Sequence, residues 1–543
     1  MGDRRLVTID CETDPFKHGR IPKPFVWGSY DGNEFIRFNN STELLDYWST
    51  KNVWLVAHNG GKFDFLFMLH YVTKSRVLEI GGRVVQMKIG NALLRDSFSI
   101  LPMALAAYSK TPFEYWKMEV EFRDQFKDEI TSYLADDCRD LYELVDVFME
   151  TAGKKSTIAA NAMAHARKLG IDVGKTHAHF DDKFRMYYYG GRVEVFKGGE
   201  FANVDVFDIK SSYPNAMKQN HPTGDEGIVI DSLDGLNDDA IGQSFVHITC
   251  HSTGAFPRKD DNGALCFPVG EYEFKVTGWE YLIAKKHGLI SNEEIHSIFI
   301  FNESITFGDY VDHWFEHKDR ADKDGDAAQR IVGKIMLNSL YGKTAQNPRN
   351  YSDCKIVPNG TKVDYDEGWA LAYEYENIEV HKRPTLWKYQ QKYGDDWQSM
   401  PLFYNVATGA SITGFARAHL LDAICTVGIE NVIYCDTDSM ILEPGTDVSG
   451  LRRDGKLGAW EWEGTGNPCY VAGKKMYGLK WIAGPNEGKE KLAHKGAKLT
   501  FDEIRRVSEG ETVEWKNDAP SLSLVRSPKF VVRSIRATAL NTN

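Results

Sequence analysis

Short apolar runs alternate with helical patterns through the first 180 residues of the chain. Leu6–Ile9 and Val53–Ala57 have the length and composition of strands, and the second run is apolar enough to be buried on both faces. Residues 128–150 repeat apolar side chains at helical spacing. This alternation predicts an α/β domain over residues 1–180.

The rest of the chain mixes strand, helix and loop patterns. Residues 204–207 form a strand-like run, residues 327–341 a helix, and Val432–Tyr434 and Ser439–Leu442 flank an acidic turn, which predicts a hairpin. Residues 221–240 hold six acidic residues, no basic residue and three glycines, which predicts a loop-rich excursion. Residues 345–400 are polar and contain proline, and we expect an insertion with little regular structure.

Length and composition place the chain among multidomain globular proteins. Its 543 residues exceed what one core fills, and with 42% hydrophobic residues it can bury large cores. No apolar run is long enough to span a membrane, and we expect no signal peptide and no membrane partner. The eight cysteines are scattered without a C-x-x-C pair, which argues against a zinc site or a disulfide framework and favours a reducing, intracellular setting.

The charge is unevenly distributed. A net charge of −12 argues against a nucleic-acid partner when it is taken alone. Residues 451–543 nevertheless carry a net +6, against −18 for residues 1–450. The basic part contains Lys480, Lys491, Lys495 and Lys498, so a DNA contact there stays open, while acidity that only keeps the body soluble is the alternative.

Two carboxylates come with the first predicted strand. Asp10 and Glu12 stand at i and i+2, so a pleated strand points both side chains to one face. Converging carboxylates repel unless a cation lies between them, and hard divalent cations prefer oxygen ligands. For this pair alone, a solvated acidic turn is the alternative.

Two further segments could complete a metal site. Asp64 lies on a Gly-containing turn after a buried strand, together with Asn59 and Phe63. Tyr133 and Asp137 stand at i and i+4 and share one face of the predicted helix. Two metals held by four carboxylates can cleave phosphodiesters with activated water, and a tyrosine beside them could orient that water.

A second acidic set lies in the other half of the chain. Asp208 follows the strand-like run 204–207, and Asp436 and Asp438 lie in the predicted hairpin. If these strands are neighbours, the carboxylates converge as two-metal phosphoryl transfer requires. An exposed hairpin turn is the alternative.

The helix pattern between the two acidic segments carries a polar stripe. Its members fall at i, i+4, i+8 and i+11, namely Arg330, Lys334, Asn338 and Tyr341. Two cations and an aromatic ring on one face suit a triphosphate and a base. An ordinary amphipathic helix with a solvated polar face is the alternative.

These motifs in this order resemble known families. Asp10 and Glu12, Asn59 and Asp64, and Tyr133 and Asp137 match the three exonuclease motifs of DEDD 3′→5′ proofreading enzymes. D-x-x-S-x-Y-P, K-x-x-x-N-S-x-Y-G and Y-x-D-T-D-S resemble motifs A, B and C of family B DNA polymerases. The whole chain is similar to the protein-primed subgroup of phages, and residues 14–25 look closest to the polymerases of tectivirus-like phages.

The resemblance implies a fold of α/β and α+β domains. An RNase H-like 3′–5′ exonuclease domain (1–180) would be followed by a right-hand polymerase with palm, fingers and thumb. The implied segments are a first palm segment (181–220), a first insertion like terminal-protein region 1 (221–310), fingers (311–345), a second insertion like terminal-protein region 2 (346–400), a second palm segment (401–495) and a thumb (496–543).

The resemblance also implies roles for single residues. Asp208 and Asp438, with Asp436 beside them, would hold two Mg²⁺ or Mn²⁺ ions for synthesis, and Asp10, Glu12, Asp64 and Asp137 two more for proofreading. Tyr213, Arg330, Lys334, Asn338 and Tyr341 would bind the incoming dNTP, with Tyr213 excluding a 2′-OH. DNA would be contacted by Tyr188, Gly190, Gly191, Thr413, Arg417, Lys475, Tyr477, Ser97, Phe98, Leu101, Asn59 and Phe63. Lys117 would stabilise charge at the phosphate that the exonuclease cleaves, with an ordinary surface lysine as the alternative.

The chain departs from the family at Ser212, where motif A commonly has an apolar residue, and this puts fidelity or sugar discrimination in doubt. The expected enzyme is a DNA-directed DNA polymerase with proofreading, acting as a monomer in the host cytoplasm and starting synthesis on a terminal-protein hydroxyl. Its partners would be primer-template DNA, single-stranded DNA, dNTPs and the terminal protein. The alternatives are a family B enzyme with an ordinary primer, a stand-alone DEDD exonuclease, and a DNA-binding accessory without activity.

Overall fold

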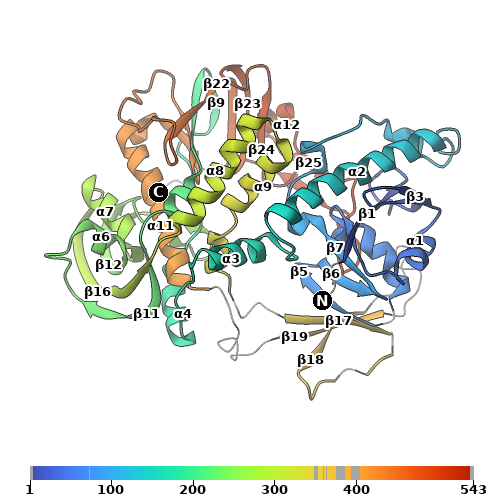
Figure 1. Ribbon diagram of the computed structural model, residues 1–543. Helices are drawn as coiled ribbons and strands as arrows, with labels where there is room; N and C mark the ends of the chain where they lie inside the picture. Colours follow the sequence, from blue (N-terminus) through green and yellow to red (C-terminus); the bar gives the residue numbers. More distant parts are fainter. Residues whose placement is uncertain are drawn as a thin grey trace.

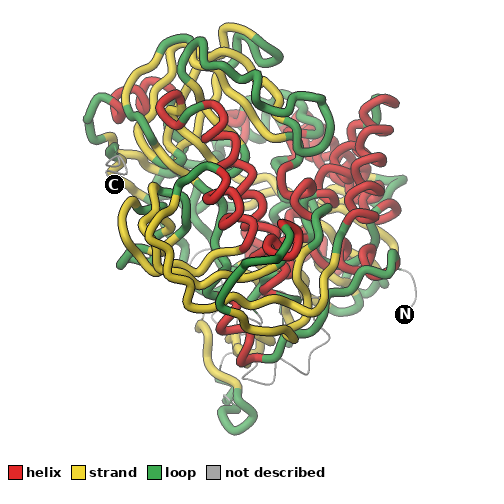
Figure 2. Tube along the Cα trace, turned by 90° about the vertical axis from the view of Figure 1, so that its left-hand side faces the viewer, coloured by secondary structure: helices red, strands yellow, loops and turns green. Residues whose placement is uncertain are grey.

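The computed structural model describes residues 4–72, 74–347, 352–358, 360–362, 364–374, 386–392 and 404–537. Within them the strands form sheets of ten, eight and four strands and two small pairs (Figure 1). Turned by 90°, the molecule shows helices gathered mainly on one side and strands on the other (Figure 2). No helix of the described residues is long and apolar enough to cross a membrane.

The N-terminal domain is built on the ten-stranded sheet, in the order β18-β19-β17-β5-β6-β7-β4-β1-β2-β3. β4 pairs in parallel with β1 and β7, and all its residues are buried, as its apolar run predicts. The expected strand Leu6–Ile9 lies within β1, and the expected helix is confirmed as α2. The bounds are β1 Arg5–Thr13, β2 Pro24–Tyr30, β3 Phe35–Phe38, α1 Ser41–Trp48, β4 Val53–Ala57, β5 Ser75–Ile80, β6 Arg83–Ile89, β7 Ala92–Asp96, α2 Lys127–Thr151, α3 Ile158–Lys168 and α4 Ala178–Arg185.

The eight-stranded sheet places β10 between β21 and β22. The expected hairpin is confirmed as β20 and β21, and β21 pairs antiparallel with β10, so the two acidic segments of this half are neighbours. The long helix α11 packs against this sheet through Leu420 and Ile424. The bounds are β8 Val193–Val195, β9 Gly199–Phe201, β10 Val204–Ile209, α5 Ser212–Met217, α11 Val406–Val427, β20 Val432–Asp436, β21 Ser439–Leu442, β22 Trp460–Gly473, β23 Met476–Ala483 and β24 Glu490–His494.

The first insertion is regular, so the expected loop over residues 221–240 is wrong for its first half. β11 (His221–Ile230) pairs with β16 (Ile290–Ile305), with a break in register between Thr223 and Gly227. Two of the three glycines that favoured a loop, Gly224 and Gly227, lie at this irregularity, where a strand bends and extra backbone freedom is useful. The four-stranded sheet is completed by β12 (Ser244–Thr253) and β15 (Val269–Thr277), and α6 (Asp238–Gly242) and α7 (Gly278–Lys286) pack on one face.

The second insertion also contains strands, which corrects the expectation of little regular structure. β17 (Ser352–Pro358) pairs with β5 of the N-terminal sheet, and β19 (Leu386–Lys392) and β18 (Trp369–Glu374) follow it. The insertion therefore continues the ten-stranded sheet at its edge (Figure 1). Residues 348–351, 375–385 and 393–400 of the predicted insertion lie outside the described residues.

Two antiparallel helices, α8 (Gly308–Asp324) and α9 (Ala327–Leu337), lie between the two large sheets (Figure 1). The expected helix over 327–341 is present, but it ends at Leu337, and Tyr341 opens the short helix α10 (Tyr341–Thr344). Tyr310 and Trp314 of α8 are fully buried and pack in one core with residues of α2 and α9.

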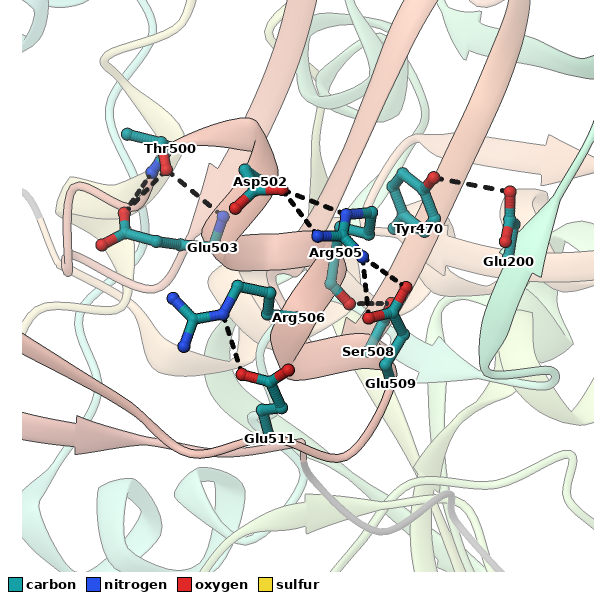
Figure 3. A network of polar contacts seen from close by, with 10 residues as sticks. All are labelled: Glu200, Tyr470, Thr500, Asp502, Glu503, Arg505, Arg506, Ser508, Glu509 and Glu511. Carbon is teal, nitrogen blue, oxygen red and sulfur yellow. Dashed lines mark hydrogen bonds and ion pairs between the residues drawn. The ribbon is translucent and has the colours of Figure 1, made fainter.

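The C-terminal segment carries helix α12 (Phe501–Ser508), which begins at a capping box formed by Thr500 and Glu503. Arg505 bonds to Asp502 and Glu509 beside it (Figure 3). β25 (Val513–Lys516) and β26 (Val532–Ile535) follow as a pair. Between these two strands the chain returns to the N-terminal sheet, where Leu522 and Leu524 are buried in its core, beside Val77, Val84, Cys354 and Ile356.

Two carboxylate clusters as candidate active sites

Four carboxylates converge in the N-terminal domain as the sequence predicts. Asp10 and Glu12 extend from the same face of β1, and Asp137 faces them from α2, with candidate ligand atoms of the three within 4.8 Å of one another. Asp64 begins the 3₁₀ helix η2 (Asp64–Tyr71) directly after the turn that follows β4. Glu12 and Asp64 are almost completely buried.

Burial and mutual repulsion dominate the electrostatics of this cluster. Burial, and then the charges of Asp64, Glu12 and Asp137, raise the pKa of Asp10 well above its usual value. The pKa of Glu12 is raised for the same reasons, and burial raises the pKa of Asp64 and of Asp137 to about 6. The main counterweights come from hydrogen bonds, including that between Tyr133 and Asp137.

Two buried oxygens of this cluster lack a hydrogen-bond partner, namely Glu12 Oε1 and Asp64 Oδ1. A buried, unpartnered carboxylate oxygen is costly unless a cation coordinates it. An all-oxygen donor set is what Mg²⁺ and Mn²⁺ prefer. The residues present therefore fit divalent metals.

Tyr133 lies at the rim of the cluster in a group of aromatic rings. Its hydroxyl is 3.3 Å from the Tyr115 hydroxyl, and its ring lies 4.6 Å from that of Phe113. Lys117 is on the neighbouring turn, but its ammonium contacts Glu129 at 2.5 Å and Glu114 at 3.0 Å rather than the carboxylate cluster. Its proposed contact with a phosphate therefore requires exchange of these ion pairs.

The predicted contacts to single-stranded DNA differ in accessibility. Ser97 and Leu101 are fully buried, and the Ser97 hydroxyl bonds to the Ala57 carbonyl, so both support the site from beneath. Phe98, Asn59 and Phe63 lie nearer the surface. Arg83 connects two of them, because its guanidinium lies 4.5 Å from the Phe98 ring and donates to Asn59 Oδ1 at 2.9 Å.

The second carboxylate set is assembled by strand pairing. The Cα of Asp208 on β10 lies opposite Ser439 on β21, and Asp436 on β20 pairs with the same Ser439. The Asp438 carbonyl accepts the Ile209 N–H at 2.7 Å, which locks the turn against the end of β10. Thr437 has a left-handed backbone with φ of 62° and carries the sharp turn between the strands.

One carboxylate of this set has an internal cation. Lys475 Nζ donates to both oxygens of Asp436, at 2.8 and 2.9 Å. The hydroxyls of Tyr434 and Thr437 donate to the same carboxylate at 3.1 and 3.0 Å. Asp436 therefore has an internal counter-charge within this acidic set.

Those two carboxylates do interact. Burial, and then the charge of Asp438, raise the pKa of Asp208 to about 7. Burial and then Asp436 raise the pKa of Asp438 to about 6, and Lys475 opposes this rise. Two partly buried carboxylates whose charges repel are the arrangement that a divalent cation relieves.

Beside this pair lies an aromatic platform. The rings of Tyr213 and Tyr341 are parallel within 3° and 4.0 Å apart, so the two motifs that carry them meet. Ser211 has a left-handed backbone with φ of 53° and turns the chain from β10 into α5. Ser212 is buried and its Oγ lacks a hydrogen-bond partner, so the departure from an apolar residue leaves an unsatisfied polar group next to Tyr213.

The predicted polar stripe on α9 is partly confirmed in geometry. Lys334 and Asn338 are exposed on one face of the helix. Arg330 instead forms an ion pair with Asp322 of α8, and the Asn338 amide donates to the Lys334 carbonyl at 2.8 Å. Arg330 would have to leave Asp322 to contact a triphosphate.

Several predicted DNA-contacting residues turn out to be supports. Arg417 is 2% exposed, forms an ion pair with Glu280 at 2.8 Å, and donates to the carbonyls of Tyr189 and Gly190 at 2.7 and 2.9 Å. Thr413 is also 2% exposed and bonds within α11. Arg417 thus holds the segment containing Tyr188 and Gly190 in place, and neither Arg417 nor Thr413 is presented to solvent.

Close packing explains two further motif residues. A Cβ on Gly191 would lie 2.7 Å from Thr437 Oγ1, so glycine lets this segment pack against the acidic turn. Tyr477 is buried and packs on Tyr434 with ring centres 5.0 Å apart. Lys475, two residues earlier, is exposed over 55% of its side chain and is the group of this motif that can reach a ligand.

Sequence reasoning missed some supporting residues. Glu280 was not singled out, although Thr277 and Glu280 form a capping box that marks the start of α7. The spacing of that box could have predicted the helix, but not the buried ion pair with Arg417, because the two residues are far apart in sequence. Tyr115 also carried no local signal, whereas Tyr434 belongs to the Y-x-D-T-D-S motif but its bond to Asp436 was not predicted.

Comparisons with known proteins identify relatives of the whole chain. A family model described as DNA polymerase type B, organellar and viral, matches residues 109–424. The DNA-directed DNA polymerase of Enterobacteria phage PRD1 is 35% identical, with 98% of each chain covered. The DNA polymerase of Bacillus phage phi29 is 27% identical over 55% of this chain and 49% of its own.

Solved structures show the same fold. The phi29 DNA polymerase complexed with single-stranded DNA superposes with a TM-score of 0.74 at 20% identity, covering 99% of this chain and 100% of the other. Its ternary complex with primer-template DNA and incoming nucleotides gives 0.72 at 19% identity. The overall architecture is therefore that of a multidomain polymerase.

Proposed function

Because the chain belongs to the protein-primed family B DNA polymerases, we propose that its two carboxylate sites carry two opposed reactions on DNA. DNA-directed DNA synthesis follows from the family. Asp208 and Asp438 would serve synthesis, and Asp10, Glu12, Asp64 and Asp137 would serve 3′→5′ proofreading. The observation that carries this proposal is the existence of two separate clusters of raised-pKa carboxylates, each on its own sheet.

Divalent cations held by these carboxylates would supply the Lewis acidity that activates the attacking oxygen and neutralises the leaving group. In the proofreading site, the hydroxyl of Tyr133 is positioned to hold the attacking water, because it already bonds Asp137. In the synthetic site, Lys475 holds Asp436 and lies where a primer terminus must approach Asp208 and Asp438. We place Mg²⁺ or Mn²⁺, two per site, on the basis of the oxygen donors.

The stacked tyrosines would form the floor of the dNTP site. With Tyr341 packed flat on Tyr213, neither ring can move aside easily, which supports exclusion of a 2′-OH by Tyr213. Lys334, with Arg330 once it leaves Asp322, would bind the triphosphate by charge, and Asn338 would border the nascent base pair.

Replacing the carboxylates of each site by alanine tests which reaction each site performs. Asp208→Ala or Asp438→Ala should abolish dNTP incorporation and leave degradation of single-stranded DNA unchanged. Asp10→Ala combined with Glu12→Ala should do the reverse. Incorporation that survives Asp208→Ala would show that the synthetic site lies elsewhere, and degradation that survives the double variant would do the same for proofreading. A stand-alone nuclease predicts no incorporation from any primer.

We further propose that synthesis starts on a hydroxyl of a phage terminal protein. This rests on family membership and on the two insertions between the polymerase motifs, which form one sheet of their own and one extension of the N-terminal sheet. Transfer of a labelled nucleotide onto a hydroxyl of a small phage protein is the test. Primer extension without such transfer would favour an ordinary primer instead.

A further inference from the structure

The segment Asp14–Phe25 has a defined structure and lies outside the two sets of carboxylates assigned to the two reactions. Ion pairs brace it: Arg20 contacts Asp14 and Glu119, and Lys17 also contacts Glu119. Asp14 accepts the backbone N–H of Lys23 at 2.6 Å. The loop is therefore held in shape before any ligand arrives, which lowers the entropic cost of binding.

This segment lines a hollow of about 640 Å³ on the surface of the N-terminal domain. Its walls combine apolar side chains with the charged Asp14, Lys23 and Arg123 and with polar groups from the start of α1 and from His70. Mainly apolar walls with a few placed polar groups are typical of sites for small aromatic ligands. The apolar side chains of the wall include Ile21, Pro22, Pro24, Phe25, Phe67 and Trp27.

A second hollow of about 290 Å³ shares Phe25 and Arg123 with the first. The Arg123 guanidinium lies 4.6 Å from the Phe25 ring centre and forms the common wall. Arg37, Arg123 and Lys127 line this second hollow against a single acid, Asp124, so its charged side chains sum to +2. Arg37 donates from Nη1 to Asn39 Oδ1 at 3.1 Å, and its buried Nε has no hydrogen-bond partner, so this guanidinium is only partly satisfied by the protein.

We propose that the two adjacent hollows, which share Phe25 and Arg123, together bind a nucleoside 5′-phosphate unit, with the base against Phe25 and the prolines and the phosphate against Arg37, Arg123 and Lys127. An aromatic and proline-lined chamber beside a cationic chamber matches the two halves of a nucleotide. Arginine suits the phosphate because its fork donates to two oxygens at once, and an arginine on an aromatic face suits a base by stacking.

The position of Arg37 favours a nucleotide over other aromatic anions. Asp10 pairs with Gly28 on β2, and Gly28 pairs with Arg37 on β3, so Arg37 lies on the same sheet face as Asp10, two strands away. At the usual strand spacing this is roughly 10 Å. A nucleotide or a strand end near the N-terminal carboxylates is therefore close to this site. The inference adds a binding site beyond the proposed function, and its preference for a nucleotide rests on the proposed DNA site at those carboxylates.

Photocrosslinking to the full-length protein in EDTA tests the proposal. One arm uses free 5-iodo-2′-deoxyuridine 5′-monophosphate, and the other a short single-stranded oligothymidylate with one 5-iodouracil. We expect the label on the peptides that contain Phe25 or Trp27. Arg37→Ala combined with Arg123→Ala should lower labelling about tenfold, because each charge-assisted contact to phosphate is strong. Lys127→Ala, an exposed change that spares the fold, should lower it less.

Lys88→Ala is the matched control, because Lys88 is an exposed cation on β6 outside both hollows. All variants should keep wild-type primer extension. Labelling by the free nucleotide identifies that source, and labelling by the oligothymidylate alone identifies single-stranded DNA. Label that avoids these peptides, or that persists in the Arg37/Arg123 double variant, overturns the proposal.

Discussion

The two carboxylate clusters solve one electrostatic problem in different ways. In the N-terminal cluster the acids are buried and raise one another's pKa, and two of their oxygens lack hydrogen-bond partners. In the second cluster Asp436 has a counter-charge in Lys475 and bonds to two hydroxyls, while the charge of Asp438 acts on Asp208 and that of Asp436 acts on Asp438. The first site relies on external cations for its cohesion, whereas the second carries some of its own counter-charge.

The same contrast extends beneath the sites. The part of the chain that carries the second cluster, called here the proposed polymerase half, contains a fully buried ion pair. This pair, Arg417 with Glu280, supports the Tyr188–Gly191 segment. Beneath the N-terminal carboxylates lie the neutral groups Ser97 and Leu101 and the buried Asp96, whose ion-pair partner Arg83 is partly exposed rather than fully buried. Built-in cations therefore make the polymerase half sensitive to their removal, and the N-terminal site sensitive to metal.

The largest effect is expected from Arg417→Met. Removing one partner leaves Glu280 buried and unpaired, which should cost about 3–5 kcal/mol of unfolding free energy. Urea unfolding measures the loss, and primer extension should fall with it. Glu280→Gln in the same chain should restore some of the stability, and a single variant as stable as wild type would contradict the contrast between the two halves.

Acid should weaken the polymerase half through His221. This side chain is fully buried between Ser411 and the Ala216 carbonyl, and burial lowers its pKa to about 4. The unfolded state takes up a proton near pH 6.5 and the folded state only near pH 4, so stability is full above pH 6.5 and falls as the pH drops toward 4. The expected loss is about 3 kcal/mol. In His221→Gln the change in unfolding free energy between these pH values, measured by urea titration, should be smaller by this amount. An unchanged pH dependence would exclude His221 as its source.

Lys475→Met should make the second site resemble the first. Asp436 then loses its counter-charge, and we expect incorporation to fall by roughly 10²-fold, in the range seen when one placed electrostatic contact is removed. Degradation of single-stranded DNA should remain at the wild-type rate. Lys475→Arg is the conservative control, and equal loss of both activities would indicate a fold defect instead.

The smallest effect concerns Asp64→Asn. This change removes one charge from the repelling N-terminal cluster, so in EDTA the protein should gain about 1 kcal/mol of stability. Saturating Mg²⁺ should remove or reverse the gain, because the wild type alone is then stabilised by the bound cation. Thermal unfolding with and without Mg²⁺ measures both, and a loss in EDTA would show that the repulsion is relieved by the protein itself.

The sequence predicted the chemistry of the sites better than their surroundings. Strand alternation and helical spacing were sufficient to place Asp10 with Glu12 and Tyr133 with Asp137, because those relations are local. The pairing of Lys475 with Asp436 and of Arg417 with Glu280 depends on contacts between distant segments, which no local pattern encodes. The prediction of a loop over residues 221–240 was wrong for its first half, because a strand with glycines at an irregularity has a composition similar to that of a loop.

The return of the C-terminal segment to the N-terminal sheet constrains how the protein folds during synthesis. Leu522 and Leu524 complete a core that otherwise consists of residues made near the start of translation and in the second insertion. Domains usually fold in order as they leave the ribosome. The core of the N-terminal sheet, however, stays incomplete, with an open apolar groove, until Leu522 and Leu524 have been synthesised. Such long-range closure slows folding. A chaperone that covers this groove would therefore be needed until Leu522 and Leu524 have been synthesised.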